Sequence, residues 1–317
     1  MRKLSRNEAA RLLRARDNFV ILTHRRPDGD TLGSAAALCM GLRLLGKRAW
    51  VLRNPEVTDR FAWLMEGLTV TDVPKNACIV STDVASPGML PTAFSRLTGA
   101  ITLRIDHHAS STSFTEAELV EPDSASCAEI VWELLRLLQC PFHTALMNAV
   151  YVGISTDTGC FRFANTTAHT FQTAAACAGQ GVNIYRINQE LFETNTLERL
   201  RIQAWIVEHM ELLRDGTMAI CAIPRQVELS LGVTEDDMDN ISNFPRTVAG
   251  VKVASTLRQT PEGETKLSVR AVPGYDATAI AEPFGGGGHK GAAGASIRLP
   301  LEQALEAVRQ VMEGTTR

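Results

Sequence analysis

Short apolar runs alternate with longer amphipathic stretches over the first 180 residues of the chain. Such runs, four to six residues long, are typical of parallel strands buried on both faces; they lie at Phe19–Leu22, Ala49–Leu52, Ala77–Thr82 and Ala100–Ile105. Helical spacing is predicted at residues 7–16, Thr31–Leu45, Ser126–Leu138, Thr144–Ile154 and from Asn165–Thr167 to about Gly179. The alternation favours an α/β fold with a mostly parallel sheet covered by helices on both faces.

The last third of the chain has a different pattern, which predicts a smaller α+β domain. Strands are expected at Met218–Ile223, Val248–Leu257, Lys266–Ala271 and Ala295–Leu299, with helices at Asp276–Ala281 and Leu301–Met312. A charged helical stretch from Thr196 to about Arg214 precedes them. We interpret it as a connecting helix; the alternative is a last core helix of the first domain. The expected division is therefore 1–195, 196–215 and 216–317.

Composition narrows the class of protein. The 317 residues are 45% hydrophobic and 21% charged, which is typical of a globular chain with ample core. A net charge of −3 argues against a long non-specific nucleic-acid track, although a local cationic pocket remains possible. Seven scattered cysteines without a C-x-x-C pair indicate reduced thiols of a cytoplasmic protein. We expect no membrane association, because no signal-peptide core or run of eighteen apolar residues is present.

Carboxylates and imidazoles gather where the predicted elements end. The set comprises His24, Asp28, Asp30, Asp83, Asp106, His107, His108 and Asp157. Ligands of parallel sheets bind beyond the carboxyl ends of the strands, so these side chains are expected to meet. Five carboxylates in one place require cations to compensate them. Oxygen and imidazole donors without thiolates suit Mn²⁺, Mg²⁺ or Fe²⁺, and their number suggests two ions acting on phosphorus through a bridging hydroxide.

Taken one at a time, the same residues have structural explanations that stay open at this stage. Asp30 is equally well explained as the N-cap of a helix that starts at Thr31. Asp83 and Asp157 alone are better explained as turn residues, and His107 and His108 alone as hydrogen-bonded structural histidines. The metal hypothesis therefore depends on the whole set.

A glycine-rich segment from Gly285 to Gly294 is a second candidate binding site. Its successive glycines can present backbone N–H groups to an anion, and His289 and Lys290 add donors. Arg258 and Arg270, on two predicted strands, could hold a phosphate. The alternatives are a flexible loop and solvated strand arginines.

These motifs, in this order, resemble the DHH phosphoesterase superfamily, named for the triplet found here as Asp106-His107-His108. The resemblance covers almost the whole chain and is strongest to the nanoRNases that also act as pAp phosphatases. It implies two divalent metal ions, most often Mn²⁺, with Mg²⁺, Fe²⁺ or Co²⁺ as alternatives. By position, the first ion would bind His24 and Asp28, the second Asp30, His107 and Asp157, and Asp83 would bridge them.

The resemblance also implies roles around the metals. His108 would contact the scissile phosphate or protonate the leaving oxygen, and Asp106 would orient an imidazole. The substrate's far phosphate or base would be held across a cleft between the domains by Arg258, Arg270, Gly286, Gly287, Gly288 and His289. Arg26 stands where many members have Asn, and Arg162 could also reach the cleft or lie on the surface.

The expected function is hydrolysis of very short oligoribonucleotides, including pApA, to mononucleotides, and of 3′-phosphoadenosine 5′-phosphate (pAp) to AMP. The alternative is a cyclic di-AMP phosphodiesterase; a non-catalytic nucleotide sensor and an inorganic pyrophosphatase are less favoured. Expected partners are short RNA or nucleotide substrates, with no long duplex and no membrane, and a homodimer by analogy with similar architectures.

Overall fold

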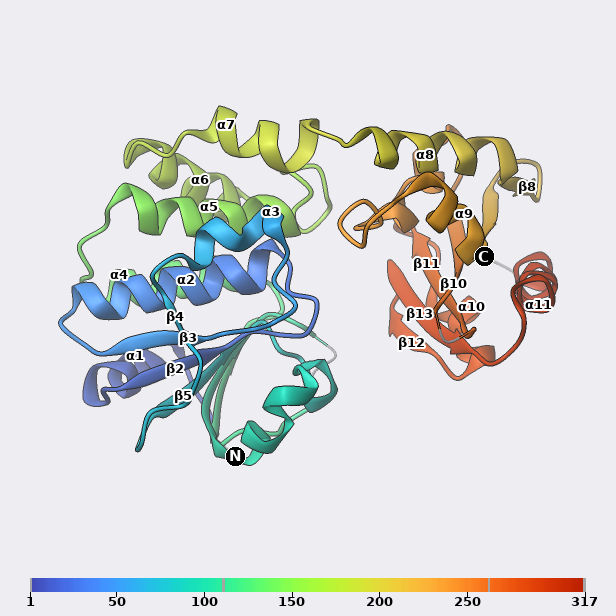
Figure 1. Cartoon of the computed structure of the whole chain (residues 1–317). Helices are drawn as coiled ribbons and strands as arrows, with labels where there is room; N and C mark the ends of the chain where they lie inside the picture. The colour runs from blue at the N-terminus through green and yellow to red at the C-terminus, as the bar shows by residue number, and fades with distance from the viewer. Residues whose placement is uncertain (1, 110–111, 262, 316–317) are drawn as a thin grey trace. The chain divides into compact units, whose positions relative to one another are not determined.

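The computed structural model describes residues 2–109, 112–261 and 263–315, and divides into two compact units, Met1–Thr194 and Asn195–Arg317. Unit 1 contains a seven-stranded sheet in the order β1-β7-β6-β5-β2-β3-β4, and every strand pair in it is parallel (Figure 1). Its strands are β1 (Arg2–Lys3), β2 (Phe19–Leu22), β3 (Ala49–Leu52), β4 (Thr69–Val70), β5 (Cys78–Thr82), β6 (Ile101–Asp106) and β7 (Ala117–Val120).

The predicted parallel sheet is confirmed, and alternate strand residues explain why its strands are apolar throughout. Phe19 and Ile21 of β2 belong to a core shared with the α-helices, whereas Val20 and Leu22 face a second core on the other side. The helices of unit 1 are α1 (Arg6–Ala15), α2 (Gly29–Leu44), α3 (Asp59–Ala62), α4 (Cys127–Leu137), α5 (Thr144–Asp157), α6 (Ala168–Gly179) and α7 (Ile184–Asn188). The second core lies under the 3-10 segments η2 (Pro87–Met89) and η3 (Thr92–Ala100).

Helix α2 packs closely against α5, which lies in a further layer on the side away from the sheet (Figure 1). Two glycines permit this approach. A Cβ added at Gly33 would lie 2.4 Å from the carbonyl oxygen of Ala149, and one at Gly153 would lie 2.9 Å from Oδ1 of Asp30. The contact brings the start of α2, which carries Asp30, beside the last turn of α5, which carries Asp157.

Unit 2 is the smaller α+β unit that the sequence predicts. Its six strands follow the order β12-β13-β11-β10-β9-β8, and only the β9–β10 pair is parallel. They are β8 (Glu211–Leu213), β9 (Met218–Ile223), β10 (Val253–Gln259), β11 (Thr265–Ala271), β12 (Gly287–His289) and β13 (Ala292–Ile297). One core includes residues of α10 (Thr278–Ala281) and α11 (Leu301–Gly314), and another includes residues of α8 (Leu197–His209) and α9 (Arg225–Leu231).

Several predicted boundaries differ from the structure. The helix expected to run from Thr196 to Arg214 ends at His209, because the chain then pairs with β9 as β8, and α8 belongs to unit 2. The strand expected from Val248 begins only at Val253, after the 3-10 segment η6 (Pro245–Thr247) and Gly250, whose φ is +93°. The glycine segment, expected as a loop, forms β12 in part.

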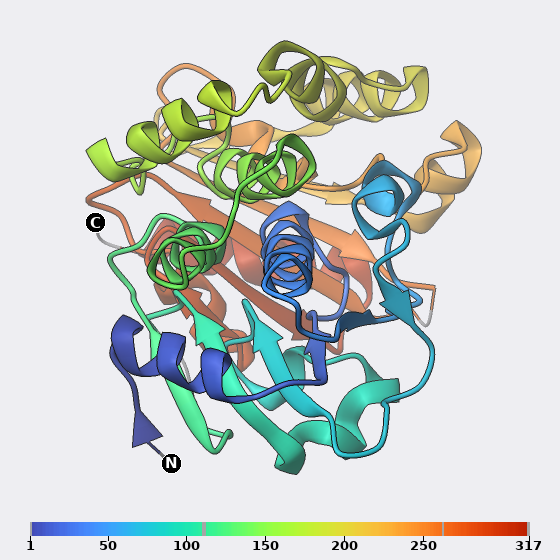
Figure 2. The same ribbon diagram turned by 90° about the vertical axis from the view of Figure 1, so that its left-hand side faces the viewer.

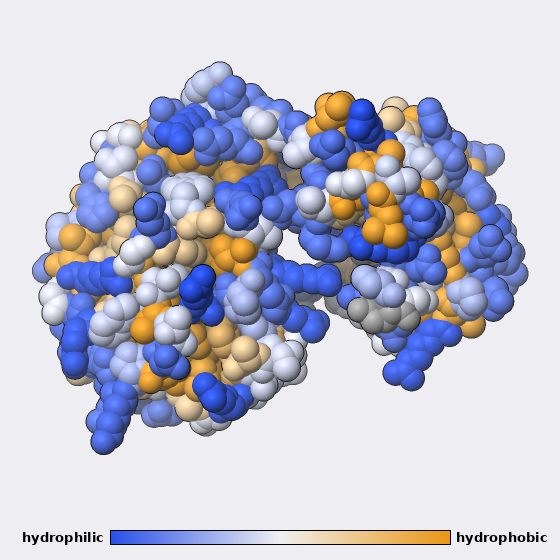
Figure 3. Space-filling model, viewed as in Figure 1, coloured by the Kyte–Doolittle hydropathy of each residue, from blue (hydrophilic) through white to orange (hydrophobic). Residues whose placement is uncertain are grey.

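Most side chains visible in the view of Figure 3 are hydrophilic, and apolar residues are exposed in small groups. In the described part of the chain, no helix is both long and apolar enough to cross a membrane.

Candidate metal centre

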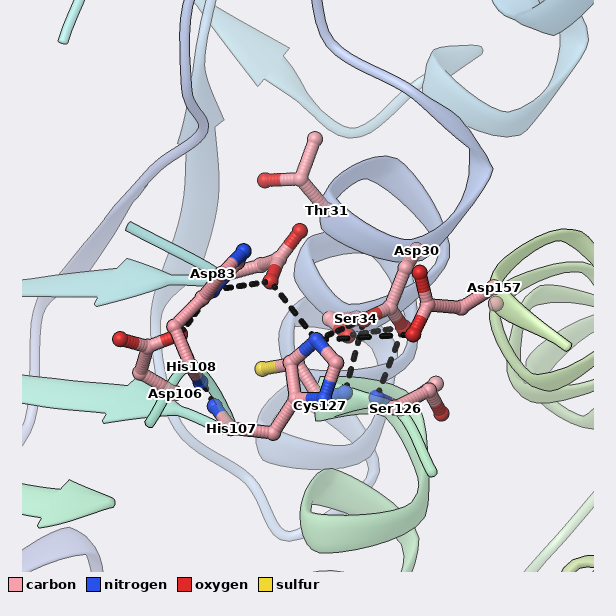
Figure 4. Close-up of polar contacts among 12 residues, drawn as sticks. Asp30, Thr31, Ser34, Asp83, Asp106, His107, His108, Ser126, Cys127 and Asp157 are labelled. Carbon is pink, nitrogen blue, oxygen red and sulfur yellow. Dashed lines mark hydrogen bonds and ion pairs between the residues drawn. The ribbon is translucent and has the colours of Figure 1, made fainter. Parts of the chain in front are cut away.

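The carboxyl ends of three neighbouring strands, β6, β5 and β2, carry most of the predicted centre. The loop after β2 contains His24 and Asp28, Asp83 follows β5, and Asp106 is the last residue of β6. Helix α2 adds Asp30, and the last turn of α5 adds Asp157. Figure 4 shows the carboxylates of Asp30, Asp83 and Asp157 around the ring of His107. Segments far apart in sequence therefore meet within unit 1, as expected from the parallel topology.

Asp28, and not Asp30, is the N-cap of α2. Its Oδ1 accepts hydrogen bonds from the backbone N–H groups of Asp30 and Thr31, at 3.0 and 3.1 Å. The helix therefore starts at Gly29, two residues earlier than predicted, and the capping explanation of Asp30 is wrong. Because Asp30 does not cap the helix, its side chain points into the centre.

Asp30 is buried against the N-terminus of another helix, α4. The backbone N–H of Cys127 donates to its Oδ2 at 2.7 Å, and that of Ala128 donates to its Oδ1 at 2.9 Å. A helix N-terminus stabilises a negative charge, which opposes the cost of burial. Burial and the carboxylates of Asp83 and Asp157 nevertheless raise the pKa of Asp30 well above its ordinary value.

Asp83 occupies the middle of the centre. Its φ of +59° is left-handed, an uncommon conformation for a non-glycine residue, and it directs the carboxylate inward from the end of β5. The Nε2 atom of His24 lies 3.4 Å from Oδ2, and Nε2 of His107 lies 3.5 Å from Oδ1. Burial alone raises the pKa of Asp83, but these two imidazoles outweigh it and hold the pKa well below its usual range.

The donor atoms form groups that fit metal ions. His24, Asp28 and Asp83 make one group, and Asp30, His107 and Asp157 make another; within each group the atoms lie within 4.8 Å of one another. A third group, Asp83, His107 and His108, shares two of its members with these. Ligands bound at about 2.1 Å around one ion lie roughly 3.0 to 3.5 Å apart, close to the separations found here. The Oδ1 atom of Asp83 is buried without a hydrogen-bond donor, as suits an oxygen that binds a cation.

The electrostatics of the residues alone show the same need for cations. Burial lowers the pKa of His107, but Asp83, Asp157 and Asp30 around the ring raise it to about 11. Burial and the neighbouring carboxylates raise the pKa of Asp157 to about 7, against the opposing effect of His107. In the protein alone, protons therefore compensate the crowded carboxylates, a role that divalent cations can fill.

The two ring nitrogens of His24 and His107 have different partners. Nδ1 of His24 lies 2.7 Å from the carbonyl oxygen of Arg25, and Nδ1 of His107 lies 3.2 Å from that of Ser124. A carbonyl can only accept, so Nδ1 carries a proton and Nε2 is the nitrogen that faces the carboxylates, where a bound cation would replace its proton. This is the arrangement of metal-binding histidines.

His108 is oriented differently. Its Nδ1 lies 2.8 Å from Oδ1 of Asp106, which also accepts the backbone N–H groups of His107 and His108. Burial lowers the pKa of His108, but Asp106 and Asp83 raise it above the ordinary value. Asp106 is fully buried and thus holds His108 from behind, which leaves Nε2 of His108 as the nitrogen not bound to Asp106.

Sequence reasoning missed the support behind Asp106. Arg104 is only 1% exposed, and its Nη2 donates to Oε2 of Glu118 at 2.6 Å. Its Nη1 lies 3.6 Å from Oδ2 of Asp106 and donates to the carbonyl oxygens of Ala85 and Thr112. The available signal was a single arginine within an otherwise apolar predicted strand.

In unit 2 the two predicted arginines differ. Arg258 is held by two carboxylates, Glu228 and Glu235, so its charge is already compensated. Arg270 is half-buried and donates to the carbonyl oxygen of Val269; burial, together with the charge of Arg246, lowers its pKa. Arg270 is therefore the better candidate for an anion. Arg162, the other open candidate, donates from Nε to the carbonyl oxygen of Gly159.

The glycines of the C-terminal segment serve close backbone packing. A Cβ at Gly286 would lie 2.3 Å from the carbonyl oxygen of Gly294, and one at Gly288 would lie 2.4 Å from that of Ala292. Gly287 has open space beside it, and His289 at the end of β12 is exposed. Side chains at Gly286 or Gly288 would thus disrupt the hairpin of β12 and β13.

Comparison with known proteins gives a consistent result. Residues 18–154 match the N-terminal domain of the DHH family, and residues 216–315 match the DHHA1 domain. The bifunctional oligoribonuclease and PAP phosphatase NrnA of Thermus thermophilus is 33% identical, over 94% of this chain and 90% of that protein. The cyclic-di-AMP phosphodiesterase GdpP of Bacillus subtilis is 24% identical over 94% of this chain, but the match covers 48% of GdpP.

Among solved structures, an exopolyphosphatase-related protein from Bacteroides fragilis has a TM-score of 0.87 and 22% identity, over 97% of this chain and 95% of that one. At this identity the likeness concerns the fold.

Proposed function

The chain belongs to the DHH family, and we propose that it is a two-metal phosphoesterase that hydrolyses very short oligoribonucleotides, including pApA, to mononucleotides, and pAp to AMP. The proposal is supported most by two groups of possible metal donors in unit 1. Asp83 belongs to one group, and its Oδ1 lies 3.5 Å from Nε2 of His107, which belongs to the other. The relative from Thermus thermophilus, matched over nearly its whole length, is named for both activities.

His24 and Asp28 would hold one ion, Asp30, His107 and Asp157 the other, and Asp83 both. We propose Mn²⁺ as the ion, because oxygen and imidazole donors without thiolate suit it, with Mg²⁺, Fe²⁺ or Co²⁺ as alternatives. Divalent ions there would supply the Lewis acidity needed for attack on phosphorus. They would also replace the protons that otherwise compensate the carboxylates.

His108 is assigned to the scissile phosphate or the leaving oxygen. Because Asp106 holds its Nδ1, a proton on Nε2 is the one available for transfer, and Asp106 stabilises the imidazolium. In unit 2 we assign binding of a further phosphate or base to Arg270, His289 and the backbone of Gly286, Gly287 and Gly288. Arg258 is the weaker candidate there, since Glu228 and Glu235 already bind it.

Two observations separate this function from its alternatives. The match to the cyclic-di-AMP phosphodiesterase spans about half of that protein, whereas the match to the oligoribonuclease spans 90% of it. A nucleotide sensor without activity is disfavoured, because every expected ligand position holds a residue able to bind metal.

The test is a side-by-side assay of the purified chain with Mn²⁺ on pApA, pAp, cyclic di-AMP, pyrophosphate and a longer RNA. We expect release of mononucleotides from pApA and of phosphate from pAp, and loss of both on chelation. Asp83→Asn, which keeps the shape and removes the charge, should reduce turnover to background. Retained turnover in that variant would refute the two-metal assignment, and activity on pyrophosphate alone would refute the substrate class.

A further inference from the structure

A cavity of about 660 Å³ opens in unit 1 next to the loop that carries His24. Its walls come from the end of β3 and from α3 and η1 (Trp63–Met65), which lie over β3 and the edge strand β4 (Figure 2). Thr23 and Asn54 form part of its wall. The volume lies within the range of about 300–1,000 Å³ that is usual for sites of small ligands.

The walls are mostly apolar, with a few polar groups. Pro55, Val57 and Ala62 contribute accessible apolar surface, and Trp63, which is 40% exposed, adds a large aromatic side chain. The exposed Arg53 supplies a cation on the wall. The exposed Glu66 adds a carboxylate to the same wall. An apolar slot with an aromatic face and a guanidinium group suits a nucleobase joined to a phosphate, because bases stack on aromatic rings and guanidinium groups bind phosphate.

Asn54 connects the cavity wall to the loop that carries His24. Its Nδ2 donates to Oγ1 of Thr23 at 3.0 Å and to the carbonyl oxygen of His24 at 2.8 Å. The ring of the same His24 faces Asp28 and Asp83. A residue of the cavity wall is thus hydrogen-bonded to the backbone of a candidate metal ligand, and Thr23, the chain neighbour of that ligand, is itself part of the wall.

We propose that this cavity binds the base of the nucleotide adjoining the scissile phosphate, with Trp63 stacking on the base and Arg53 binding a substrate phosphate. The inference rests on the proposed function and specifies it, since it gives unit 1 a base site of its own. A substrate with a base on each side of the scissile bond can place one of them here.

The experiment compares three dinucleotides: pApA, and two analogues that each lack one of its bases. Trp63→Ala should lower kcat/KM for pApA by roughly 5- to 150-fold, the value of one stacked base. The same loss should persist with one analogue and vanish with the other, because the latter lacks the base that stacks on Trp63. Trp63→Phe should retain most of the activity, and Arg53→Gln should raise KM for all three.

Tyr185→Ala is the matched control, since Tyr185 is an aromatic residue of the same unit and is 70% exposed. It should keep the wild-type kcat/KM. Equal losses on all three dinucleotides, or none, would overturn the base site. If Trp63→Ala unfolds, Trp63→Leu preserves bulk without an aromatic ring. Failure of the wild-type protein to hydrolyse pApA would refute the proposed function rather than the base site. In that case equilibrium dialysis, which compares AMP binding by the wild type and by Trp63→Leu, tests the cavity.

Discussion

At the scale of single residues, hydrogen bonds to the ring nitrogens separate histidines that the sequence leaves equivalent. His24 and His107 each direct Nδ1 at a backbone carbonyl, so that Nε2 is the nitrogen that faces the carboxylates and can bind a metal ion. His108 directs Nδ1 at Asp106 instead. Neighbours in the same triplet therefore have different chemistry, because the partner of one nitrogen decides what the other can do.

This difference predicts opposite behaviour for two matched variants. His107→Gln should weaken Mn²⁺ binding by at least roughly 10- to 100-fold, a loss seen even for outer-shell partners. His108→Gln should bind Mn²⁺ as wild type does and lose about 10²- to 10⁴-fold in kcat, the usual contribution of a proton-transferring group. Calorimetric Mn²⁺ titration and steady-state kinetics measure the two effects. A similar loss of metal affinity in both variants would make His108 a ligand.

A second prediction concerns the buried Arg104 behind Asp106. Arg104→Met leaves Glu118 buried without its cation and should lower the free energy of unfolding by about 3–5 kcal/mol. The double variant Arg104→Met, Glu118→Leu removes both charges and should recover most of this loss. Urea unfolding of both variants measures it. A double variant as unstable as the single one would show that Arg104 acts through Asp106 and the carbonyl groups rather than through Glu118.

At the scale of elements, the centre depends on the close contact of α2 and α5. Gly33→Ala should cost about 1–3 kcal/mol, the usual penalty of overpacking, because its Cβ would lie 2.4 Å from the carbonyl oxygen of Ala149. The shift would also separate Asp30 from Asp157 and lower activity. Gly99→Ala is the control, since no heavy atom lies within 4 Å of its added Cβ. Urea unfolding and pApA hydrolysis measure both effects; a neutral Gly33→Ala would contradict the tight contact.

Local sequence patterns predicted the central strands of unit 1 but missed β7, which lies between β1 and β6, as well as both edge strands. The runs Phe19–Leu22 and Ala49–Leu52 are β2 and β3 without any change of boundary, because buried parallel strands have no polar alternation. Strands β1 and β4 have two residues each, too few to give a pattern. The strand β12 was missed because glycines carry no side-chain signal that separates a strand from a loop.

At the scale of the molecule, the strand order was not available from local patterns. Strand β5 pairs with one side of β2, and β6 pairs with β5. Strand β3 pairs with the other side of β2, although β3 precedes β5 in the chain. This order places the ends of β2, β5 and β6 side by side. The sequence nevertheless predicted the set of candidate ligands, since residues able to bind metal follow the apolar strands. Their partners, such as Arg104 and the N-terminus of α4, depend on long-range packing and were missed.

The two units have separate cores, and, in the part of the chain that the structure describes, every group of candidate metal donors lies in unit 1. Binding of Mn²⁺ should therefore stabilise unit 1 selectively. At 100-fold excess over Kd the gain is about 2.7 kcal/mol, which corresponds to roughly 5–10 °C in Tm for a domain of this size.

Calorimetry of the metal-free full chain should show two transitions, of which Mn²⁺ raises one. Hydrogen exchange assigns it: amides of β2, β5 and β6 should exchange more slowly with Mn²⁺, and those of β9 to β11 should not change. Asp83→Asn should remove the shift, because it takes away the charge in the middle of the centre. If both transitions rose equally in wild type and in the variant, the ions would bind elsewhere, and the assignment of the ligands would fail independently of any activity.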